Sequence, residues 1–378
     1  MNPYEHRPWL AHYAEGVPAD IDEPTQTLVD MIDDAVKRFR RRTALEFFGA
    51  ETSYRDLGEQ IAAAAEGQEV FYGVLPLFHA YGMTLCLTFA MSMGARLVLF
   101  PKFDSKLVLD AVRHSPPTFL PAVPPIYDQL VRAAEGRTHL LASIRFAISG
   151  AMSLPIATVD RWESATGGLL VEGYGMTESS PISVGNPMGP TRRPGTVGVP
   201  FPSTEIRVVD PDDPDTDRPA GESGELLVRG PQVFQGYWRR PSETAETLLP
   251  GGWLRTGDIV HVSDDGYVTI VDRVKELIIT GGFNVSPSEV EAALLAHPDV
   301  RGAAVVGLPR ASGGEAVVAG VELREGAVFD EAALRDFCRT SLTPYKVPRR
   351  IEPFDELPRS LIGKVLRREV RDVLLERD

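Results

Sequence analysis

The sequence contains very little cysteine. Cys86 and Cys338 are the only two among 378 residues, and they lie far apart in the chain. Such a pair matches neither the spacing of a metal site nor a disulfide framework. The N-terminal stretch MNPYEHRPWLAHYAEG is charged and lacks the apolar run of a secretory signal peptide. Both absences favour a reducing compartment, and we expect a cytoplasmic location.

An excess of basic residues is also missing. Lys and Arg number 39 against 53 Asp and Glu, which gives a formal net charge of -14. A chain of this charge is poorly suited to neutralise phosphates, so we expect no nucleic-acid partner. The hydrophobic fraction of 43% is ordinary for globular proteins, and the length is sufficient for two or three hydrophobic cores.

No apolar run is both long and uninterrupted. The longest, Met83 to Phe100, is divided by Gly94, Ala95 and Arg96. Each half is too short to cross a bilayer, and a buried helix followed by a strand fits the pattern better. We therefore expect no transmembrane segment, and peripheral contact with a membrane stays open.

Helical patterns alternate with short β-branched runs in the first half of the chain. Helices are predicted at residues 28–39, 106–115, 124–135 and 154–167, and strands at 116–123, 144–150 and 169–175. This βα alternation predicts an α/β fold with a mostly parallel sheet and helices on both of its faces.

The pattern of predicted helices and strands changes twice in the rest of the chain. From about residue 195, short strands such as TEIRVVD, GELLVRG and GYVTIVD predict a β-rich subdomain. From residue 276, a capping box of Ser286 and Glu289 starts a helix in a compact α+β module. We predict a large domain at 1–271 with its β-rich part at 195–271, a hinge at 272–275 and a small domain at 276–378.

The stretch GYGMTESSP, Gly173 to Pro181, is too polar for a core strand and too rich in glycine for a helix. It follows a predicted strand, and ligands of parallel sheets bind beyond the carboxyl ends of strands. Tyr174 offers a flat face to a planar ring, Thr177 a hydroxyl to a phosphate and Glu178 an oxygen to Mg²⁺. A polar surface loop explains the spacing equally well.

Three further segments carry candidate chemistry. In WLRTGDI, Asp258 is expected to follow a tight turn and could accept hydrogen bonds from a ribose diol. DRVKELIITGGFNV combines Arg273 and Lys275 with the flexible pair Gly281–Gly282, and PRSLIGKVLRRE has Lys364 before a helix. Taken singly, a turn aspartate and a surface lysine are the simpler explanations.

Taken together, these segments resemble the adenylate-forming superfamily of acyl-CoA synthetases, luciferases and peptide-synthetase adenylation domains. The matching motifs follow one another in the family's order: PLFHAYGMT, ISGAM, GYGMTESSP, GELLVRGPQVFQGYWRRPSET, GWLRTGDI, GYVTIVDRVKELIITGGFNVSPSEVE and PRSLIGKVLRR. The resemblance is continuous from Val70 to the C-terminus. Long-chain fatty-acid–CoA ligases are the most similar subfamily, through RPWLAHYAEGVP, FNVSPSEVE and LTPYKVP.

The resemblance implies ATP or AMP, Mg²⁺ and CoA as ligands, with roles for individual residues. The nucleotide-binding positions it implies are Ser149, Gly150, Ala151, Gly173, Tyr174, Gly175, Asp258 and Arg273. Tyr174 would flank the adenine, opposite the turn at Ser149, and Asp258 with Arg273 would hold the ribose. Thr177 would contact phosphate and Glu178 would bind the metal.

The same resemblance implies a moving small domain. Lys275 would mark the hinge, and Lys364 would reach the fatty-acid carboxylate and the α-phosphate. Rotation would then withdraw Lys364 and present Gly281 and Gly282 to the pantetheine of CoA. His79 would lie near the acyl tunnel, although an interior histidine with purely structural contacts explains it equally well.

One family motif is absent. Neither a Ser/Thr/Gly-rich phosphate loop ending in Pro-Lys-Gly nor GxxxxGK[ST] occurs upstream of PLFHAYG. The sequence up to about residue 65 resembles the family's early helix, and from Glu69 it resembles the family's sequence downstream of that loop. About 150 residues, a domain's worth, are missing between them by this comparison. The deletion would remove donors to the β- and γ-phosphates and leave a sheet edge open to a partner copy.

Three hypotheses arise from the sequence. The first is an ATP-dependent fatty-acid–CoA ligase whose activity is reduced or lost. The second is a non-catalytic remnant that binds nucleotide or acyl-adenylate, or acts as an interaction protein. The third is adenylation for a carrier protein instead of CoA. The retained Lys364 and Glu178 favour the first, the missing loop favours the second, and pyrophosphate exchange into ATP separates the two.

Overall fold

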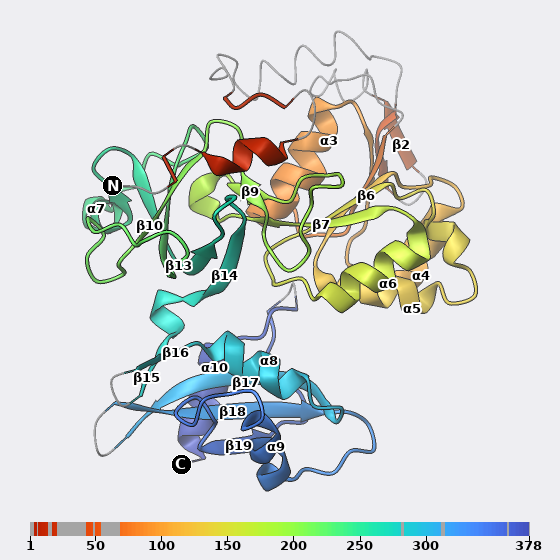
Figure 1. Cartoon of the computed structure of the whole chain (residues 1–378). Coiled ribbons are helices and arrows are strands. Elements are labelled where there is room, and N and C mark those ends of the chain that lie inside the picture. The colour runs from red at the N-terminus through yellow and green to blue at the C-terminus, as the bar shows by residue number, and fades with distance from the viewer. Residues whose placement is uncertain are drawn as a thin grey trace.

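The computed structural model describes residues 4–5, 7–13, 17–20, 43–47, 50–53, 69–280, 283–310, 314–360 and 363–377. The helix predicted at 28–39, the residues before Glu69 at the predicted deletion, and Gly281 and Gly282 lie outside these ranges. The described elements form an α/β part, a β-rich part and a C-terminal module (Figure 1).

The α/β part is built on a mixed sheet. Across the described ranges, nine strands follow the order β2-β1-β4-β3-β5-β6-β7-β8-β9. Their bounds are β1 Thr43–Phe47, β2 Ala50–Ser53, β3 Val70–Gly73, β4 Arg96–Leu99, β5 Phe119–Ala122, β6 Phe146–Ser149, β7 Leu169–Tyr174, β8 Val184–Gly185 and β9 Val199–Pro200.

The inner strands of this sheet, from β1 to β7, pair in parallel, and β2, β8 and β9 pair antiparallel. The predicted α/β class with a mostly parallel sheet is confirmed. On the side of the predicted deletion the sheet continues past β4 to β1 and ends at the short strand β2. Oligomerisation through this edge stays a prediction.

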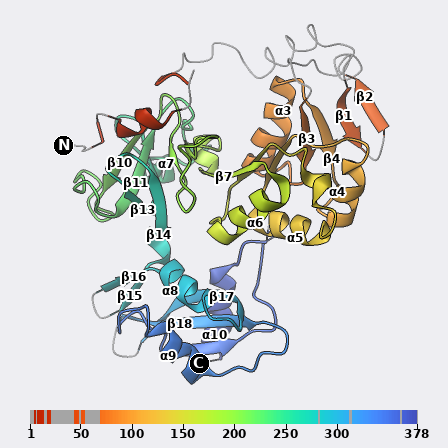
Figure 2. The same cartoon turned by 45° about the vertical axis from the view of Figure 1, so that its right-hand side comes forward.

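Helices cover both faces of the sheet (Figure 2). On one face lie α4 Ser105–Val112, α5 Pro124–Ala133 and α6 Ile156–Thr166, with the short turn η3 Thr138–Leu141 beside them. The other face carries the π-helical segment η2 Gly82–Thr88 and α3 Phe89–Ser92. The long apolar run is thus a helical segment followed by β4, as predicted. Among the helices that the structure describes, none has the length and apolarity to span a membrane.

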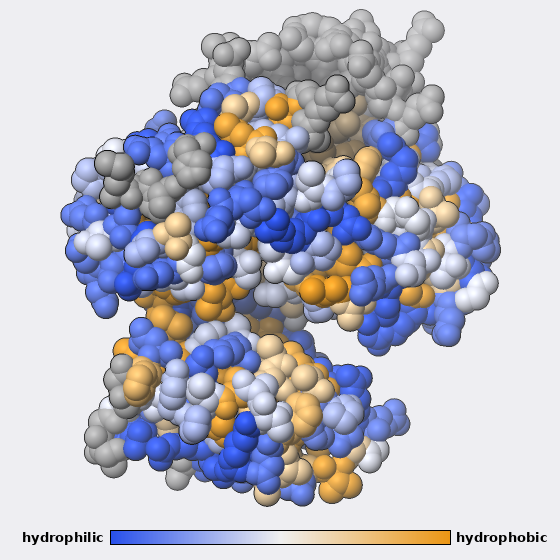
Figure 3. Space-filling model, viewed as in Figure 1, coloured by the Kyte–Doolittle hydropathy of each residue, from blue (hydrophilic) through white to orange (hydrophobic). Residues whose placement is uncertain are grey.

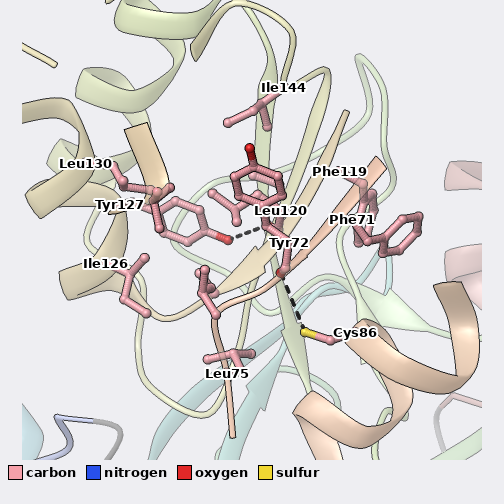
Figure 4. Packing of buried hydrophobic residues seen from close by; sticks show 14 of the residues in the cluster. Phe71, Tyr72, Leu75, Cys86, Phe119, Leu120, Ile126, Tyr127, Leu130 and Ile144 are labelled. Atoms are coloured by element: carbon pink, nitrogen blue, oxygen red, sulfur yellow. Dashed lines mark hydrogen bonds between the residues drawn. The ribbon is translucent and has the colours of Figure 1, made fainter. Parts of the chain in front are cut away.

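Large apolar side chains fill the space between the sheet and its helices (Figure 4). Tyr127 is fully buried, and its hydroxyl donates to the carbonyl oxygens of Leu120 at 2.9 Å and Ile148 at 2.6 Å. Its ring contacts Trp162 edge to face. Burial raises the pKa of the Cys86 thiol to about 12. Cys86 is therefore a protonated packing residue, because only the thiolate is reactive.

The β-rich part is a second, antiparallel sheet. Its strands are β10 Glu205–Val209, β11 Gly224–Arg229, β12 Leu248–Leu249, β13 Trp253–Val262 and β14 Val268–Arg273, with helix α7 Pro241–Thr247 before β12. The three strands predicted from sequence are β10, β11 and β14. The longest strand, β13, contains the WLRTGDI motif.

The N-terminal segment completes the core of this β-rich part. A short helix, η1 Pro8–His12, lies against the sheet and buries Trp9, which is 1% exposed. Gly266, at φ +92°, accommodates this ring, since a Cβ there would come within 2.8 Å of the Trp9 backbone. Tyr4 is also buried, and its hydroxyl donates to Val262 O at 2.9 Å and accepts from Gly221 N at 3.3 Å.

Tyr4→Phe is expected to destabilise the protein by about 1–3 kcal/mol, because it leaves a buried carbonyl and an amide without their partner. Urea unfolding monitored by tryptophan fluorescence measures the loss. Tyr13→Phe, which removes the bond from a half-buried hydroxyl to Pro200 O, is the matched control and should cost less. Equal stability of Tyr4→Phe and wild type would show that the N-terminal segment contributes little to this core.

The C-terminal module is an α+β unit. The hairpin β15 Ile278–Thr280 and β16 Phe283–Val285 precedes a sheet of β17 Val300–Pro309, β18 Glu315–Leu323 and β19 Arg350–Pro353. Helices α8 Pro287–Leu295 and α9 Glu331–Cys338 pack on one face, and α10 Arg367–Glu376 packs on the other. The module has the α+β composition predicted from sequence, and α8 begins after Ser286 as expected.

Two sequence predictions about the junction before this module are refined. The predicted hinge, 272–275, comprises the last two residues of β14 and the first two of the 3₁₀ turn η5 Val274–Glu276. Ser286 caps α8, as its hydroxyl accepts from Glu289 N at 3.2 Å. The Glu289 carboxylate binds Lys346 Nζ at 2.6 Å. In a full capping box, the Glu289 carboxylate would accept a hydrogen bond from Ser286 N. Here it is bound by Lys346 instead.

The surface of the described residues is mostly polar, with apolar side chains scattered between charged ones (Figure 3). Exposed large apolar residues include Phe78, Trp238 and Val328, which come from the α/β part, the β-rich part and the C-terminal module respectively. Apolar residues exposed singly in this way are normal for globular proteins.

Candidate nucleotide site

The carboxyl ends of β6 and β7 bring two of the predicted segments together. The strands are parallel, with Ser149 paired to Glu172, so the turn at Ser149–Ala151 lies beside Gly173–Gly175. Ala151 adopts φ +63°, a strained conformation for alanine that often marks functional sites. The Ser149 hydroxyl is fully buried and has no partner among the described residues. A ligand donor or acceptor at this turn would satisfy it.

The loop after β7 folds tightly back on itself. A Cβ on Gly175 would lie 1.8 Å from the Pro181 carbonyl oxygen, so this position requires glycine. Gly173 is also close-packed, since a Cβ there would meet the Ile182 side chain at 3.0 Å. On the other side, the Tyr81 ring lies 3.3 Å from where a Gly150 Cβ would be. These approaches fix the backbone around Tyr174.

Tyr174, Asp258 and Arg273 form one hydrogen-bonded group. The Tyr174 hydroxyl donates to Asp258 Oδ2 at 2.6 Å, and Arg273 Nε lies 2.8 Å from Asp258 Oδ1. Asp258 is 2% exposed. Burial raises the pKa of its carboxyl group even though Arg273 and the Tyr174 hydroxyl favour the carboxylate. The pKa of Tyr174 is well above its usual value because of burial and the neighbouring Asp258, so Tyr174 is a permanent donor.

The expectation that Asp258 follows a tight turn is wrong. Asp258 lies within β13, after Gly257 at φ +70°. Against β11, three residues of β13 lie between Arg255 and Ile259 where β11 has one between Leu227 and Glu225, which is a β-bulge. Gly257 N donates to Glu225 Oε1 at 3.1 Å and fixes the irregular backbone. The bulge, in place of a turn, holds Asp258 beside Tyr174 and Arg273.

The C-terminal module contributes Lys364 to the same region. Lys364 lies in a tight turn in which Gly363 N donates to Ser360 O and Ser360 N to Lys364 O, both at 2.8 Å. A Cβ at Gly363 would be 4.0 Å from Pro125 of α5, so the turn lies close to the α/β part. Desolvation lowers the pKa of the Lys364 amine, and the positive Arg273 lowers it further. Glu276 and Asp258 act in the opposite direction, and Lys364 itself is exposed.

Thr177 and Glu178 begin the short turn η4 Thr177–Ser179, where Thr177 is exposed. Glu178 Oε1 accepts from the Tyr237 hydroxyl at 2.7 Å, and Phe234 N donates to Glu178 O at 2.8 Å. The described side chains include no group of three or more His, Cys, Asp or Glu residues that could hold a metal. A single carboxylate still suits Mg²⁺, which is usually held by one or two carboxylates and substrate phosphates.

Two of the predicted site residues, His79 and Lys275, are at least partly exposed. His79 is partly exposed, and its Nδ1 accepts from Tyr81 N at 3.2 Å. This contact with a near neighbour in the chain does not decide between the two explanations of His79. Lys275 is exposed on η5. The roles of all these residues remain predictions.

Glu172 is a buried carboxyl group that the sequence reasoning missed. It precedes Gly173 on β7, is 9% exposed, and accepts from Leu154 N at 3.1 Å through Oε1. Burial raises its pKa to about 8, although the Leu154 bond partly offsets this. The only sequence signal was an acid within the apolar strand LLVE.

Glu172 makes stability depend on pH. Its folded pKa is above the unfolded value of 4.5, so the unfolded chain loses the proton first and stability falls as pH rises from about 4.5 to 8. Glu172→Gln keeps the acceptor without the ionisation. It should therefore be more stable than wild type at pH 8, by on the order of 3–5 kcal/mol, and nearly equal to it at pH 4.5. Thermal melts across this pH range test the prediction, and Glu135→Gln, at an exposed position, is the control. If the melting temperatures of wild type and Glu172→Gln changed in parallel with pH, the raised pKa of Glu172 would be contradicted.

Comparisons with known proteins match this architecture. Residues 63–238 match the family model described as AMP-binding enzyme, and residues 289–364 match AMP-binding enzyme C-terminal domain. A long-chain-fatty-acid–CoA ligase of Bacillus subtilis (strain 168) is 40% identical over 305 residues, which cover 81% of this chain and 54% of that protein. The chain thus spans about half the length of the curated relatives it matches.

Solved structures include MatB from Rhodopseudomonas palustris in two states. The ATP-bound crystal structure matches at a TM-score of 0.76 and the apo crystal structure at 0.64. Both are 35% identical, and the alignments cover 81% of this chain and 60% of MatB. The chain belongs to the AMP-binding enzyme family and carries matches to both its AMP-binding domain and its C-terminal domain.

Proposed function

We propose that this chain is an acyl-adenylate-dependent ligase that joins a long-chain fatty acid to CoA, using ATP and Mg²⁺. The observation that carries the proposal is the hydrogen-bonded group of Tyr174, Asp258 and Arg273 at the carboxyl end of β7, with the turn that contains Lys364 lying close to α5 of the same α/β part. The better match to the ATP-bound form of MatB than to its apo form supports it. The chain length of the acid rests on the ligase relatives alone.

The residue types suit this chemistry. An oxygen of the fatty-acid carboxylate forms a bond to the α-phosphorus of ATP, and the bond to pyrophosphate breaks. Lys364 would offset the negative charge that gathers at the α-phosphate, and the buried Asp258 would accept from the ribose hydroxyls. Glu178 is the residue that fits Mg²⁺, which would neutralise phosphate charge as pyrophosphate leaves. No proton transfer is needed in this step.

The second step needs fewer contacts. The CoA thiol attacks the acyl carbonyl carbon of the adenylate, a thioester forms, and AMP leaves. Gly281 and Gly282 would line the path of CoA, and His79 the path of the acyl chain. Neither step requires a secreted or membrane-spanning protein, and a cytoplasmic location is part of the proposal.

Pyrophosphate exchange into ATP tests the first step. Purified protein with a long-chain fatty acid and Mg²⁺ should catalyse exchange that depends on the acid, at a rate below that of full-length relatives because the phosphate loop is absent. Exchange without the acid, or exchange stimulated equally by an amino acid, would contradict the proposal.

Asp258→Ala should weaken the binding of AMP and ATP alike, by about 1–3 kcal/mol, because the ribose loses its buried acceptor. Calorimetric titration of both nucleotides measures this. Asp217→Ala, which breaks the ion pair with Arg207 elsewhere in the β-rich part, is the matched control and should bind like wild type. Unchanged AMP affinity in a folded Asp258→Ala variant would remove Asp258 from the site.

A further inference from the structure

Arg367 lies three residues after Lys364 and contacts both sides of the junction between the β-rich part and the C-terminal module. Within the module, its guanidinium donates to Glu291 Oε1 and Oε2 at 2.8 and 2.6 Å and to Ser288 Oγ at 2.7 Å. It also contacts Glu276 of η5. Across the junction, Nη1 lies 3.3 Å from Asp272 Oδ1. Arg367 therefore connects the Lys364 turn to the strand that carries Arg273.

Asp272 is the acceptor on the other side. It belongs to β14 and pairs with Ile259, the neighbour of Asp258, so its backbone is part of the nucleotide site's framework. Its side chain is only 1% exposed. Oδ2 accepts from Ser286 Oγ at 2.6 Å and from Ser288 N at 2.8 Å. One buried carboxylate thus holds the start of α8 and the start of α10.

These contacts keep the Arg367 guanidinium positively charged. Burial alone would lower the pKa of Arg367, but the bonds to Glu291 and the charges of Asp272 and Glu276 raise it above its usual value. An unpaired buried charge is costly, so Asp272 and Arg367 favour the pose in which they meet. In that pose, the turn that contains Lys364 lies close to α5 of the α/β part. The pair is broken whenever the module turns away from β14.

We propose that Asp272 and Arg367 are a positioning pair for the first half-reaction: together they hold the C-terminal module with Lys364 at the nucleotide site, and they separate before thioester formation. Neither residue touches substrate; they act through Lys364. The inference rests on the proposed function and extends it to the control of the two half-reactions. It is consistent with the closer match to the ATP-bound form of MatB.

The half-reactions test the pair in intact protein. Asp272→Ala and Arg367→Ala are expected to lower acid-dependent pyrophosphate exchange about 10–100-fold and to leave thioester formation from supplied acyl-adenylate within about twofold of wild type. Arg367→Lys should recover part of the exchange rate. Arg359→Ala is the control, since Arg359 pairs with Glu322 inside the module at 2.7 Å and should affect neither step selectively. An equal fall in both steps would reduce the pair to a structural role and overturn the proposal.

A second measurement needs no activity. Cysteines placed at Pro125 and Gly363, which approach each other in this pose, should form a disulfide under mild oxidant, while the native Cys86 and Cys338 are buried. Asp272→Ala should slow that cross-linking about tenfold, and Arg359→Ala should not. Equal rates in all three backgrounds would overturn the positioning role. The protein could also lack both half-reactions while Asp272→Ala still slows the cross-linking. That result would refute the proposed function and leave the positioning role of Asp272 and Arg367 supported.

Discussion

Lys364→Ala is expected to reduce acyl-adenylate formation by at least about 10²–10³-fold and to leave thioester formation from supplied acyl-adenylate within about twofold of wild type. The physical reason lies in the Lys364 turn. It lies close to α5 in the pose with Asp272 and Arg367 joined, so under the proposed function its amine would reach the α-phosphate. Charge grows on phosphate oxygens only in the first step, and a cation positioned there stabilises that transition state alone.

The two half-reactions should be measured on the same preparation, by pyrophosphate exchange and by release of AMP from acyl-adenylate with CoA. Lys346→Ala is a suitable control, because this lysine of the same module pairs with Glu289. It should leave both rates near wild type. A parallel loss of both steps in Lys364→Ala, with an unchanged melting temperature, would contradict a role confined to adenylation.

The second large effect concerns the triphosphate. Wild-type protein should convert supplied acyl-adenylate and CoA to acyl-CoA at least about 10²-fold faster than it converts fatty acid, ATP and CoA. Under the proposed function, the residues brought together at β6, β7 and β13 would contact adenine, ribose and the α-phosphate. The sequence lacks the loop that would supply donors to the β- and γ-phosphates. Those donors matter only while pyrophosphate is leaving.

Product formation from each substrate set, at matched enzyme concentration, measures this ratio. AMP should also lose less affinity than ATP relative to a full-length relative. A full reaction at the rate of such a relative would contradict the account, and would mean that other residues or a second chain supply the phosphate contacts.

Sequence reasoning predicted much of the fold because periodicity and chain order determine it. The βα alternation implied a parallel sheet, and parallel strands place their carboxyl ends on one edge. The family resemblance implied that the turn at Ser149 lies opposite Tyr174, and the parallel pairing of β6 with β7 brings the two segments together. The helix N-cap at Ser286 could be predicted from the four residues 286–289, because helix caps depend on local sequence.

Contacts between distant residues could not be predicted in this way. Tyr174 and Asp258 are 84 residues apart in the sequence. Asp258 lies in a bulged part of β13, and the local sequence pattern does not predict that bulge. Arg367 and Asp272 are 95 residues apart and meet through the packing of the C-terminal module against β14. Trp9 is an apolar residue in a charged segment, and only the packed β-rich sheet reveals where it is buried.

If β6, β7, β13 and the Lys364 turn form one acyl-adenylate site, a binding measurement detects that site without catalysis. Calorimetric titration of wild-type protein with a long-chain acyl sulfamoyl adenosine, an unreactive mimic of acyl-adenylate, should give one site per chain and an affinity at least about tenfold above that of AMP. Asp258→Ala should weaken it by about 1–3 kcal/mol. Folded wild-type protein that binds neither the mimic nor AMP would contradict the presence of this site.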